Sequence, residues 1–352
     1  MTARKATIAI IAGDGIGPEV VEAGFPVIEA AARAESLELV TRFLPYSASH
    51  YLATGETLPD EGFEYLKDDV DGIFVGALGD PRVPGNEHAR DILLGLRFKL
   101  DLYINFRPTR LYHPRLSPLR RDGKPGIDFV IFRENTEGQY LGYGRSESVG
   151  TADEVHVSEE INTRKGVARI LEAAFMWANE RGRTRVTMSD KSNAIPFQRI
   201  WGQLFKEIGA RYPGVEQEHR YVDALALELV REPERFQVIV TTNLYGDILS
   251  DLGAGLVGGL GIAASANLHP GRPGLYEPVH GSAPGLVGRQ LANPIATVLT
   301  GALMLERLGC GAGAFRLEQA VSRVVAEGPL TPDLGGTGTT GEVAKALGEA
   351  IR

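Results

Sequence analysis

The sequence has one cysteine, Cys310, which excludes a disulfide bond within the chain. It also lacks any apolar run near the ~20 residues that a membrane-spanning helix needs. The first apolar run, Ala6–Ala12, is followed at once by a Gly/Asp turn, which is typical of a buried strand rather than of a signal peptide. Basic residues number 37 against 45 acidic ones, and the formal charge of −8 argues against nucleic acid as a main partner. We therefore expect a cytoplasmic protein that binds neither membranes nor nucleic acid.

Apolar strands alternate with amphipathic helical patterns along the 352 residues. This alternation predicts an α/β fold, in which helices cover the faces of a sheet. Weak alternation at Ala152–Ser158 predicts an exposed β-arm without an internal partner, available to pair with another subunit. The expected strands are Ala6–Ala12, Gly72–Val75, Phe129–Phe132, Arg185–Met188 and Val238–Thr241, and the expected helices are Pro18–Ala32, Gly166–Arg181 and Phe197–Ile208.

A glycine-rich turn, Gly13-Asp14-Gly15-Ile16-Gly17-Pro18, ends the first expected strand. The dinucleotide-binding fingerprint G-x-G-x-x-G requires its third glycine at the position that Pro18 occupies here. Pro18 suits the first turn of a helix instead. We reject a Rossmann assignment and keep a functional loop as a possibility.

Two aspartates, Asp247 and Asp251, stand four residues apart in a segment with helical apolar spacing. On a helix they share one face, where two carboxylates repel unless a cation lies between them. Oxygen ligands suit Mg2+ or Mn2+. A solvated acidic helix face is the alternative. Because the pair follows the apolar stretch Phe236–Thr241, at the edge where open α/β sheets bind ligands, we favour a metal site.

Three arginines, Arg97, Arg107 and Arg133, are embedded in apolar sequence rather than in charged runs. A guanidinium group pairs with a carboxylate through two parallel hydrogen bonds. Structural ion pairs are the alternative for each arginine taken alone. Three of them together with a metal site favour a polycarboxylate substrate.

Three further polar residues are candidates for chemistry: Tyr140, Lys191 and Asp223. Lys191 follows an expected strand and is a candidate base. Asp223 lies in an apolar segment, so its carboxylate needs a partner. Packing or surface roles are the alternative for the tyrosine and the lysine.

Five sequence motifs, in the same order along the chain, resemble those of the β-decarboxylating dehydrogenases. This is the family of isocitrate, isopropylmalate, homoisocitrate and tartrate/D-malate dehydrogenases. The resemblance covers nearly the whole chain. It implies a two-domain, isopropylmalate dehydrogenase-like α/β fold with a parallel or mixed, non-Rossmann sheet. A cofactor-side domain of residues 1–102 and 258–352 would surround an inserted domain, 103–257, that carries a β-arm near 140–160. The motifs are Gly13–Glu19, Arg133–Gly138, Asp190–Asn193, Asn243–Asp251 and Glu277–Pro284.

The same resemblance implies residue roles. Asp223, Asp247 and Asp251 would hold Mg2+ or Mn2+, with Asp223 also contacting substrate and, like Lys191, coming from the other subunit of a homodimer. Lys191 would accept or relay the hydroxyl proton, and Tyr140 would protonate the enol carbon. The three arginines would bind the carboxylates of a dicarboxylate substrate.

The cofactor loop implied by the resemblance departs from the family pattern at one position. NAD-dependent members carry an acidic residue just after Ala-Pro, whereas this sequence has Gly285. No cluster of basic residues favours a 2′-phosphate, so we expect NAD, with NADP left open. The implied cofactor-binding residues are Asn193, His280, Gly281, Ser282, Ala283, Pro284 and Asn293.

The identity of the substrate depends on two signals. Leu93 and Leu94 resemble the apolar wall that isopropylmalate dehydrogenases use for a branched alkyl group, so 3-isopropylmalate is expected first. Arg133–Gly138 is closer to the isocitrate, homoisocitrate and tartrate branches, and Asp91 leaves a polar substituent open. A non-catalytic regulatory subunit and a purely metal-binding module are more distant alternatives, since all the implied catalytic residues are present.

Overall fold

The computed structural model describes residues 4–120 and 126–352. The chain forms two compact units. The first contains Met1–Leu102, Arg107–Gly126 and Ala254–Arg352, and the second contains Tyr103–Phe106 and Ile127–Gly253. The inserted domain expected from the sequence, 103–257, differs from the second unit at 107–126 and 254–257. The domain boundaries stay a prediction.

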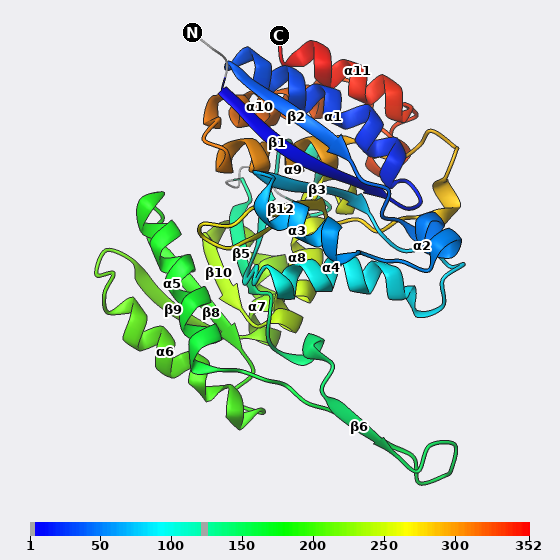
Figure 1. The fold of residues 1–352 in the computed structure, drawn as a ribbon. Coiled ribbons are helices and arrows are strands. Elements are labelled where there is room, and N and C mark those ends of the chain that lie inside the picture. The colour runs from blue at the N-terminus through cyan, green and yellow to red at the C-terminus, as the bar shows by residue number, and fades with distance from the viewer. Residues whose placement is uncertain (1–3, 121–125) are drawn as a thin grey trace. The chain divides into compact units, whose positions relative to one another are not determined.

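The first unit contains a mixed sheet with strand order β2-β1-β3-β12-β11 (Figure 1). All neighbours in it are parallel except β11, which runs antiparallel to β12. Strand β4 (Ile104–Arg110) has residues in both units. The strands of the first unit are β1 (Arg4–Gly13), β2 (Leu37–Phe43), β3 (Gly72–Ala77), β11 (Ala264–Leu268) and β12 (Gly274–Pro278).

Helices cover both faces of this sheet because β1 and β3 are apolar on both sides. Phe74 packs its ring edge-on against Phe25 of α1, with ring centroids 5.3 Å apart. Ile73 and Val75 point the other way, into a cluster that includes Leu96 of α4. The helices are α1 (Gly17–Ala34), α2 (Ala48–Thr54), α3 (Asp60–Asp68), α4 (Glu87–Lys99), α9 (Ile295–Arg307), α10 (Gly311–Glu327) and α11 (Thr340–Ala350).

The second unit contains a parallel sheet with strand order β5-β10-β8-β9. Helices α5 and α6 pack on each other through Phe175 and Phe205, whose ring centroids lie 5.2 Å apart, and α7 lies on the other side of the strands (Figure 1). The elements are β5 (Asp128–Glu134), β8 (Arg185–Asp190), β9 (Glu216–Tyr221), β10 (Val238–Thr241), α5 (Arg164–Glu180), α6 (Arg199–Gly209), α7 (Val222–Arg231) and α8 (Asn243–Val257).

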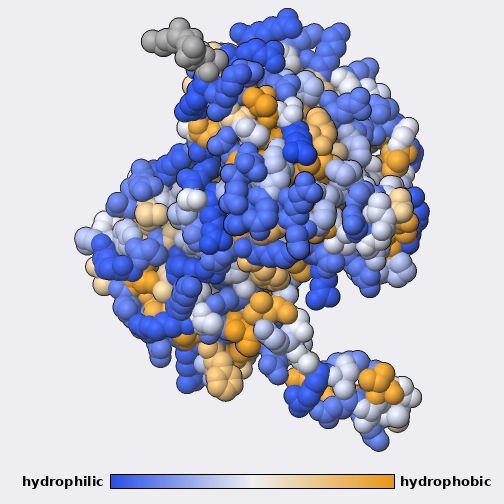
Figure 2. All heavy atoms as spheres, viewed as in Figure 1, coloured by the Kyte–Doolittle hydropathy of each residue, from blue (hydrophilic) through white to orange (hydrophobic). Residues whose placement is uncertain are grey.

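An exposed hairpin of β6 (Gly144–Glu147) and β7 (Val155–Ser158) projects from the second unit (Figures 1 and 2). The sequence predicted an arm at 152–158 without an internal partner, and that part of the prediction is wrong. β7 pairs antiparallel with β6 of the same chain. Gly144-Arg145-Ser146-Glu147 has no apolar residue, so alternation of hydrophobicity could not reveal it as a strand.

The predicted fold class is confirmed: this is an α/β protein with a mixed sheet. Each strand and helix expected from the sequence is present, with ends shifted by a few residues. Helix α6, for example, begins at Arg199, after a short 3-10 turn at Pro196–Gln198. In the described part of the chain, no helix is long and apolar enough to cross a membrane.

Candidate active site

The acidic pair lies on α8, as the sequence predicted. Asp247 and Asp251 are one helical turn apart, four and eight residues after the helix begins at Asn243. The Asp247 side chain is 36% exposed, and Asp251 is exposed. Leu249 on the same helix is fully buried. The helix therefore packs one side into the unit and presents the carboxylates on another.

Two predicted site residues, Arg133 and Tyr140, converge on Asp247. The Arg133 Nη1 group donates to Asp247 Oδ1, and the Tyr140 hydroxyl donates to Asp247 Oδ2 at 2.8 Å. The guanidinium carbon of Arg133 lies 5.2 Å from the centre of the Tyr140 ring, within cation–π range. A cation, a phenol and a carboxylate thus form one network within the second unit.

The network is rigid because α8 passes very close to β5. A Cβ atom on Gly246 would lie 2.6 Å from Cβ of Arg133, so this position requires glycine. Arg133 is 1% exposed and also donates through Nε and Nη2 to Asn243 Oδ1, at 2.9 and 2.8 Å. Asn243 is held in turn by the carbonyl of Glu137, which accepts from its Nδ2 at 2.9 Å.

Lys191 and Asp223 form a second pair in the same unit. Lys191 directly follows β8, and Asp223 is the second residue of α7. Lys191 Nζ lies 2.7 Å from Asp223 Oδ1. The hydrogen bond from Lys191 holds the pKa of the Asp223 carboxyl below its ordinary value. The sequence predicted Lys191 and Asp223 as separate candidate residues, and in the structure they are in contact.

The three predicted metal ligands do not form one cluster within the chain. Among the described residues, no group of three or more His, Cys, Asp or Glu side chains is placed to hold a metal ion. Asp247 and Asp251 share α8, while Asp223 is held by Lys191. The oxygen donors are of the kind that Mg2+ and Mn2+ prefer, and one chain supplies them in two separate sets.

In the first unit, Arg97 pairs with Glu277. Arg97 Nη2 donates to Glu277 Oε1 at 2.8 Å, and Asn267 Nδ2 donates to the same oxygen at 2.9 Å. Burial alone raises the pKa of Glu277, but the charge and hydrogen bond of Arg97, the Asn267 bond and the charge of Arg107 outweigh it. The pKa of Glu277 therefore lies below its ordinary value, and the residue holds Arg97 as a carboxylate.

Replacing Glu277 with glutamine is expected to lower the free energy of unfolding by about 3 kcal/mol near pH 7, because it leaves a buried guanidinium without its carboxylate. Since the folded-state pKa is depressed, this stabilisation is complete above the unfolded-state pKa and is lost as pH falls through the folded-state pKa. Urea unfolding at pH 7 and pH 3 measures the difference. A variant as stable as the wild type at pH 7 contradicts the assigned ion pair.

Helix α4 carries the predicted substrate wall. Leu94 and Arg97 lie on neighbouring turns of one face. Leu93, four residues before Arg97, lies on the same side of the helix and packs against the core cluster that contains Ile92 and Leu96. Asp91 is exposed and accepts a long hydrogen bond from Thr57 Oγ1 at 3.5 Å.

The predicted cofactor loop, 280–284, begins two residues after the end of β12 at Pro278. The His280 Nδ1–H group donates to the Gly281 carbonyl at 3.1 Å, and its Nε2 atom is buried without a hydrogen-bond partner in the described part of the chain. Burial lowers the pKa of His280, so the ring is neutral. Asn293 is buried and donates to Asp333 at 3.0 Å. A buried acceptor without a donor fits a ligand with a hydrogen-bond donor.

Two other cofactor positions are open to solvent. Asn193 is exposed in the loop after β8. Gly285 is exposed, and a Cβ atom there would have no heavy atom within 4 Å. Position 285 therefore has room for a Cβ atom.

The whole sequence matches one family description. Residues 7–351 match "Isocitrate/isopropylmalate dehydrogenase". The chain belongs to the isocitrate/isopropylmalate dehydrogenase family. Membership identifies it as an oxidoreductase of the decarboxylating-dehydrogenase kind, as the resemblance implied.

Relatives in this family with different activities in their names are about equally similar to the chain. A 3-isopropylmalate dehydrogenase of Thermobifida fusca is 43% identical over 330 residues, covering 93% of each chain. A tartrate dehydrogenase/decarboxylase of Pseudomonas putida is 43% identical over 363 residues, covering 100% of this chain and 99% of the relative. The crystal structure of an isocitrate dehydrogenase from Methylococcus capsulatus superimposes with a TM-score of 0.88 at 36% identity, covering 99% of each chain.

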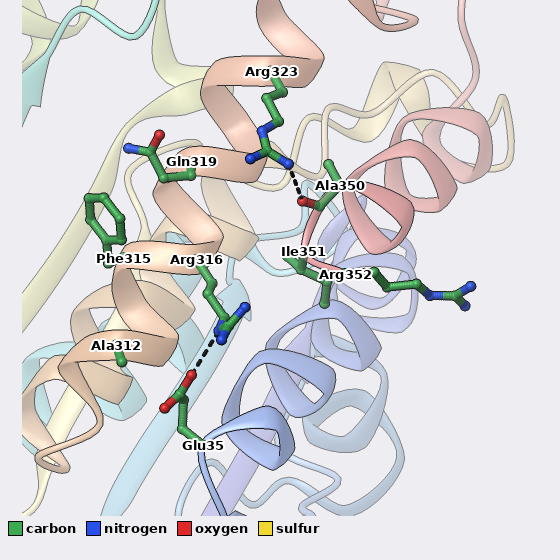
Figure 3. Close-up of a pocket in the computed structure, with 9 residues that line it drawn as sticks. All are labelled: Glu35, Ala312, Phe315, Arg316, Gln319, Arg323, Ala350, Ile351 and Arg352. Carbon is green, nitrogen blue, oxygen red and sulfur yellow. Dashed lines mark hydrogen bonds and ion pairs between the residues drawn. The ribbon is translucent and has the colours of Figure 1, made fainter.

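A pocket of about 360 Å³ lies elsewhere in the first unit, between α10 and the C-terminal end of α11 (Figure 3). Two of its arginines are already hydrogen-bonded within the lining: Arg316 donates to Glu35 at 2.7 Å, and Arg323 donates to the Ala350 carbonyl at 3.2 Å. None of the residues expected from the family resemblance lines it, so it is separate from the candidate site.

Three polar residues that contact the predicted site were not singled out from the sequence. Glu277 and Asn243 each begin one of the five family motifs, and a polar side chain at the start of such a motif is a signal that could identify them. Asn267 lies in β11, outside every motif. Its contact with Glu277 comes from strand pairing, which the sequence does not show.

Proposed function

We propose that this family member catalyses the metal-dependent oxidative decarboxylation of a 3-substituted malate, with hydride transfer to NAD. One observation carries the proposal. A candidate acid, Tyr140, and a candidate base, Lys191, are each hydrogen-bonded to one of the three aspartates assigned to the metal. A regulatory subunit would not need to keep both pairs.

Asp247 and Asp251 would hold Mg2+ or Mn2+ together with Asp223 of a second subunit. The separation of the donors into two sets within one chain supports a shared site in a homodimer. When bound, the ion would supply a Lewis acid that stabilises negative charge developing on the substrate oxygens.

The neutral amine form of Lys191 would take up the C2 hydroxyl proton at Nζ as hydride leaves C2 for the nicotinamide of NAD. Its contact with Asp223 holds the amine where the sheet strands end, the edge at which α/β sheets bind ligands. Loss of the β-carboxylate as CO2 would then leave an enolate. The Tyr140 hydroxyl, already a donor to Asp247, would deliver a proton to the C3 carbon.

The arginines would bind the two carboxylates of the substrate. Arg97 is held in orientation by Glu277, and Arg133 is held by Asn243 and Asp247. A guanidinium whose side chain is already fixed loses little conformational entropy on binding a carboxylate. Arg107, the third of these arginines, is 7% exposed, and its positive charge helps to lower the pKa of Glu277.

The 3-substituent is proposed to be apolar, with 3-isopropylmalate as the first candidate. Leu94 is a half-buried apolar side chain three residues before Arg97, on the face of α4 that carries this arginine. The Thermobifida fusca relative, 43% identical, carries the corresponding name.

One observation favours a second candidate, a malate with an anionic substituent such as isocitrate or homoisocitrate. Arg90 is exposed on α4, two helical turns before Arg97 and on the same face. A guanidinium there would attract a further carboxylate. The equal similarity to a tartrate dehydrogenase/decarboxylase keeps tartrate and D-malate among the alternatives.

NAD would bind at the loop 280–284 with Asn293 and Asn193. The unpartnered Nε2 atom of neutral His280 offers an acceptor, and the exposed Gly281 adds no side chain that would obstruct a dinucleotide. Gly285 offers neither an acceptor for a ribose 2′-hydroxyl nor a cation for a 2′-phosphate. Selection between NAD and NADP is therefore expected to be weak, with NAD preferred.

Replacing Gly285 with aspartate is expected to lower KM for NAD by about tenfold, because it adds a charged acceptor for the ribose hydroxyl. KM for NADP is expected to rise, since the carboxylate repels the 2′-phosphate. Steady-state kinetics with both dinucleotides measure the change, and Gly285→Ala controls for the added Cβ atom. Improved use of NADP by the aspartate variant contradicts the placement of this loop at the ribose.

The stoichiometry of the reaction tests the proposal. Enzyme treated with EDTA and supplied with 3-isopropylmalate and NAD is expected to be inactive until Mg2+ or Mn2+ is restored. It is then expected to release one CO2 for each NADH formed. NADH without CO2 would limit the activity to oxidation, and full activity without a divalent ion would exclude the metal role.

A further inference from the structure

Asp14, in the glycine-rich loop after β1, is buried and fully engaged. Its Oδ1 atom accepts from the Ala48 N–H group at 2.7 Å, and Oδ2 accepts from the Gly79 N–H group at 2.9 Å. His88 Nε2 lies 2.7 Å from the same Oδ2 atom. The three donors belong to the start of α2, the loop after β3 and the start of α4. One carboxylate therefore joins three segments that are distant in sequence.

The contact between Asp14 and His88 is well defined. Asp14 is 5% exposed and His88 is 0% exposed, so water cannot replace either partner. Because the carboxylate oxygen accepts, Nε2 carries the proton, and Nδ1 has no hydrogen-bond partner among the described residues. The Tyr51 ring stacks on the imidazole at 6.1 Å and limits its rotation. A buried carboxylate without these donors is strongly disfavoured.

The loop that carries Asp14 also holds the candidate cofactor loop. The Ile16 N–H group donates to the Ser282 carbonyl at 2.8 Å. A Cβ atom on Gly15, whose φ is +58°, would lie 1.9 Å from that carbonyl oxygen. Ile16 also packs in an apolar cluster with Ala283 and Leu286. The two loops are in backbone contact that only glycine at position 15 permits.

On its other side, Asp14 holds the candidate substrate helix. His88 is the second residue of α4, the helix that carries Leu94 and Arg97. A helix is stiff over this length, so fixing its first turn fixes the position of the later side chains. No side chain other than His88 links α4 to Asp14 in the described part of the chain.

We propose that Asp14 is a positioning residue that holds the cofactor loop 280–284 and the substrate helix α4 in one fixed arrangement. The inference rests on the proposed function, which assigns NAD to the loop and the substrate to the helix. Asp14 itself is assigned no contact with either ligand. Its hydrogen bonds set the geometry of both sites. The contact with His88 (the His88 branch) holds only the substrate helix, and the remaining contacts of Asp14 are the shared branch.

Asp14→Asn tests the shared branch. Asparagine keeps one acceptor oxygen and turns an NH2 group toward another donor, so one buried N–H group loses its partner. We expect Kd for NADH, measured by fluorescence, and KM for the malate substrate each to rise by about tenfold. The value of kcat is expected to fall much less, because no reacting group is changed.

His88 variants test the separate branch. His88→Ala is expected to raise the substrate KM by about tenfold and to leave Kd for NADH within about twofold. His88→Gln, which retains a donor, is expected to recover most of the loss. Val325→Ala, in the buried face of α10, is the control for lost stability alone, with Kd and KM unchanged.

Two results would overturn the inference. The first is an Asp14→Asn enzyme whose Kd and KM match those of Val325→Ala at similar thermal stability. The second comes from amide hydrogen exchange of the ligand-free Asp14→Asn protein, which can be measured even if the wild type oxidises no malate and the proposed function fails. We expect faster exchange than in the wild type in both 87–99 and 280–287. Faster exchange confined to the glycine-rich loop would show that Asp14 holds neither segment.

Discussion

Replacing Lys191 with methionine is expected to lower kcat by about 10²- to 10⁴-fold, the usual contribution of a positioned acid or base. Methionine keeps the length of the side chain and removes the only nitrogen that is assigned to take the hydroxyl proton. Mn2+ binding is expected to persist, because all three aspartates remain. Steady-state kinetics and Mn2+ titration by electron paramagnetic resonance measure the two properties separately.

The matched control is Lys165→Met, which removes an exposed lysine on α5 of the same unit. It is expected to leave kcat unchanged. A Lys191→Met enzyme that keeps more than a tenth of the wild-type kcat would remove this lysine from the proton transfer.

Replacing Asp247 with asparagine is expected to lower kcat/KM by more than about 100-fold, since a metal site supplies several kcal/mol of charge stabilisation and 1.36 kcal/mol corresponds to tenfold. Two effects combine. The variant loses a charged ligand, and its NH2 group faces either Arg133 or the Tyr140 hydroxyl, both of which donate to Asp247 in the wild type. Mn2+ affinity is expected to fall with activity.

Asp69→Asn, which removes an exposed carboxylate just after α3 of the first unit, is the control for the same change of charge. Its activity and Mn2+ affinity are expected to match the wild type. If Asp247→Asn loses activity but binds Mn2+ as tightly as the wild type does, Asp247 serves the Arg133–Tyr140 network and not the metal.

Local spacing was sufficient to predict the elements that carry the site. The helical period around Asp247 and Asp251 predicted α8, and the apolar stretch before it predicted β10. Arg133, an arginine in an apolar segment, is buried with partners, as the pattern indicated. These inferences depend only on residues within one or two turns of each other.

Contacts between distant segments could not be predicted in the same way. Glu277 lies 180 positions from Arg97, and no residue near Glu277 signals its partner. Arg133, Tyr140 and Asp247 come from β5, the turn after β5, and α8. These segments meet only once the parallel sheet has formed. The sequence supplied the set of side chains, and the sheet order determines which of them touch.

Two details show where periodicity is ambiguous. Leu93 and Leu94 are adjacent and equally apolar, yet only Leu93 packs against the core cluster. A helix rotates by about 100° between neighbouring residues, so two adjacent leucines at the edge of the buried face can differ in this way. His88 is fully buried beside Asp14, although nothing around it in sequence distinguishes it from an exposed histidine.

The measurement that tests the central claim most directly is kcat/KM with NAD and Mg2+ for 3-isopropylmalate, isocitrate, homoisocitrate, tartrate and D-malate. We expect 3-isopropylmalate to exceed each of the others by at least about tenfold, the discrimination that an apolar pocket provides. A preference for isocitrate or homoisocitrate would contradict the apolar wall at Leu94 and assign the substituent to Arg90. No turnover of any of the five would contradict the proposed oxidative decarboxylation itself.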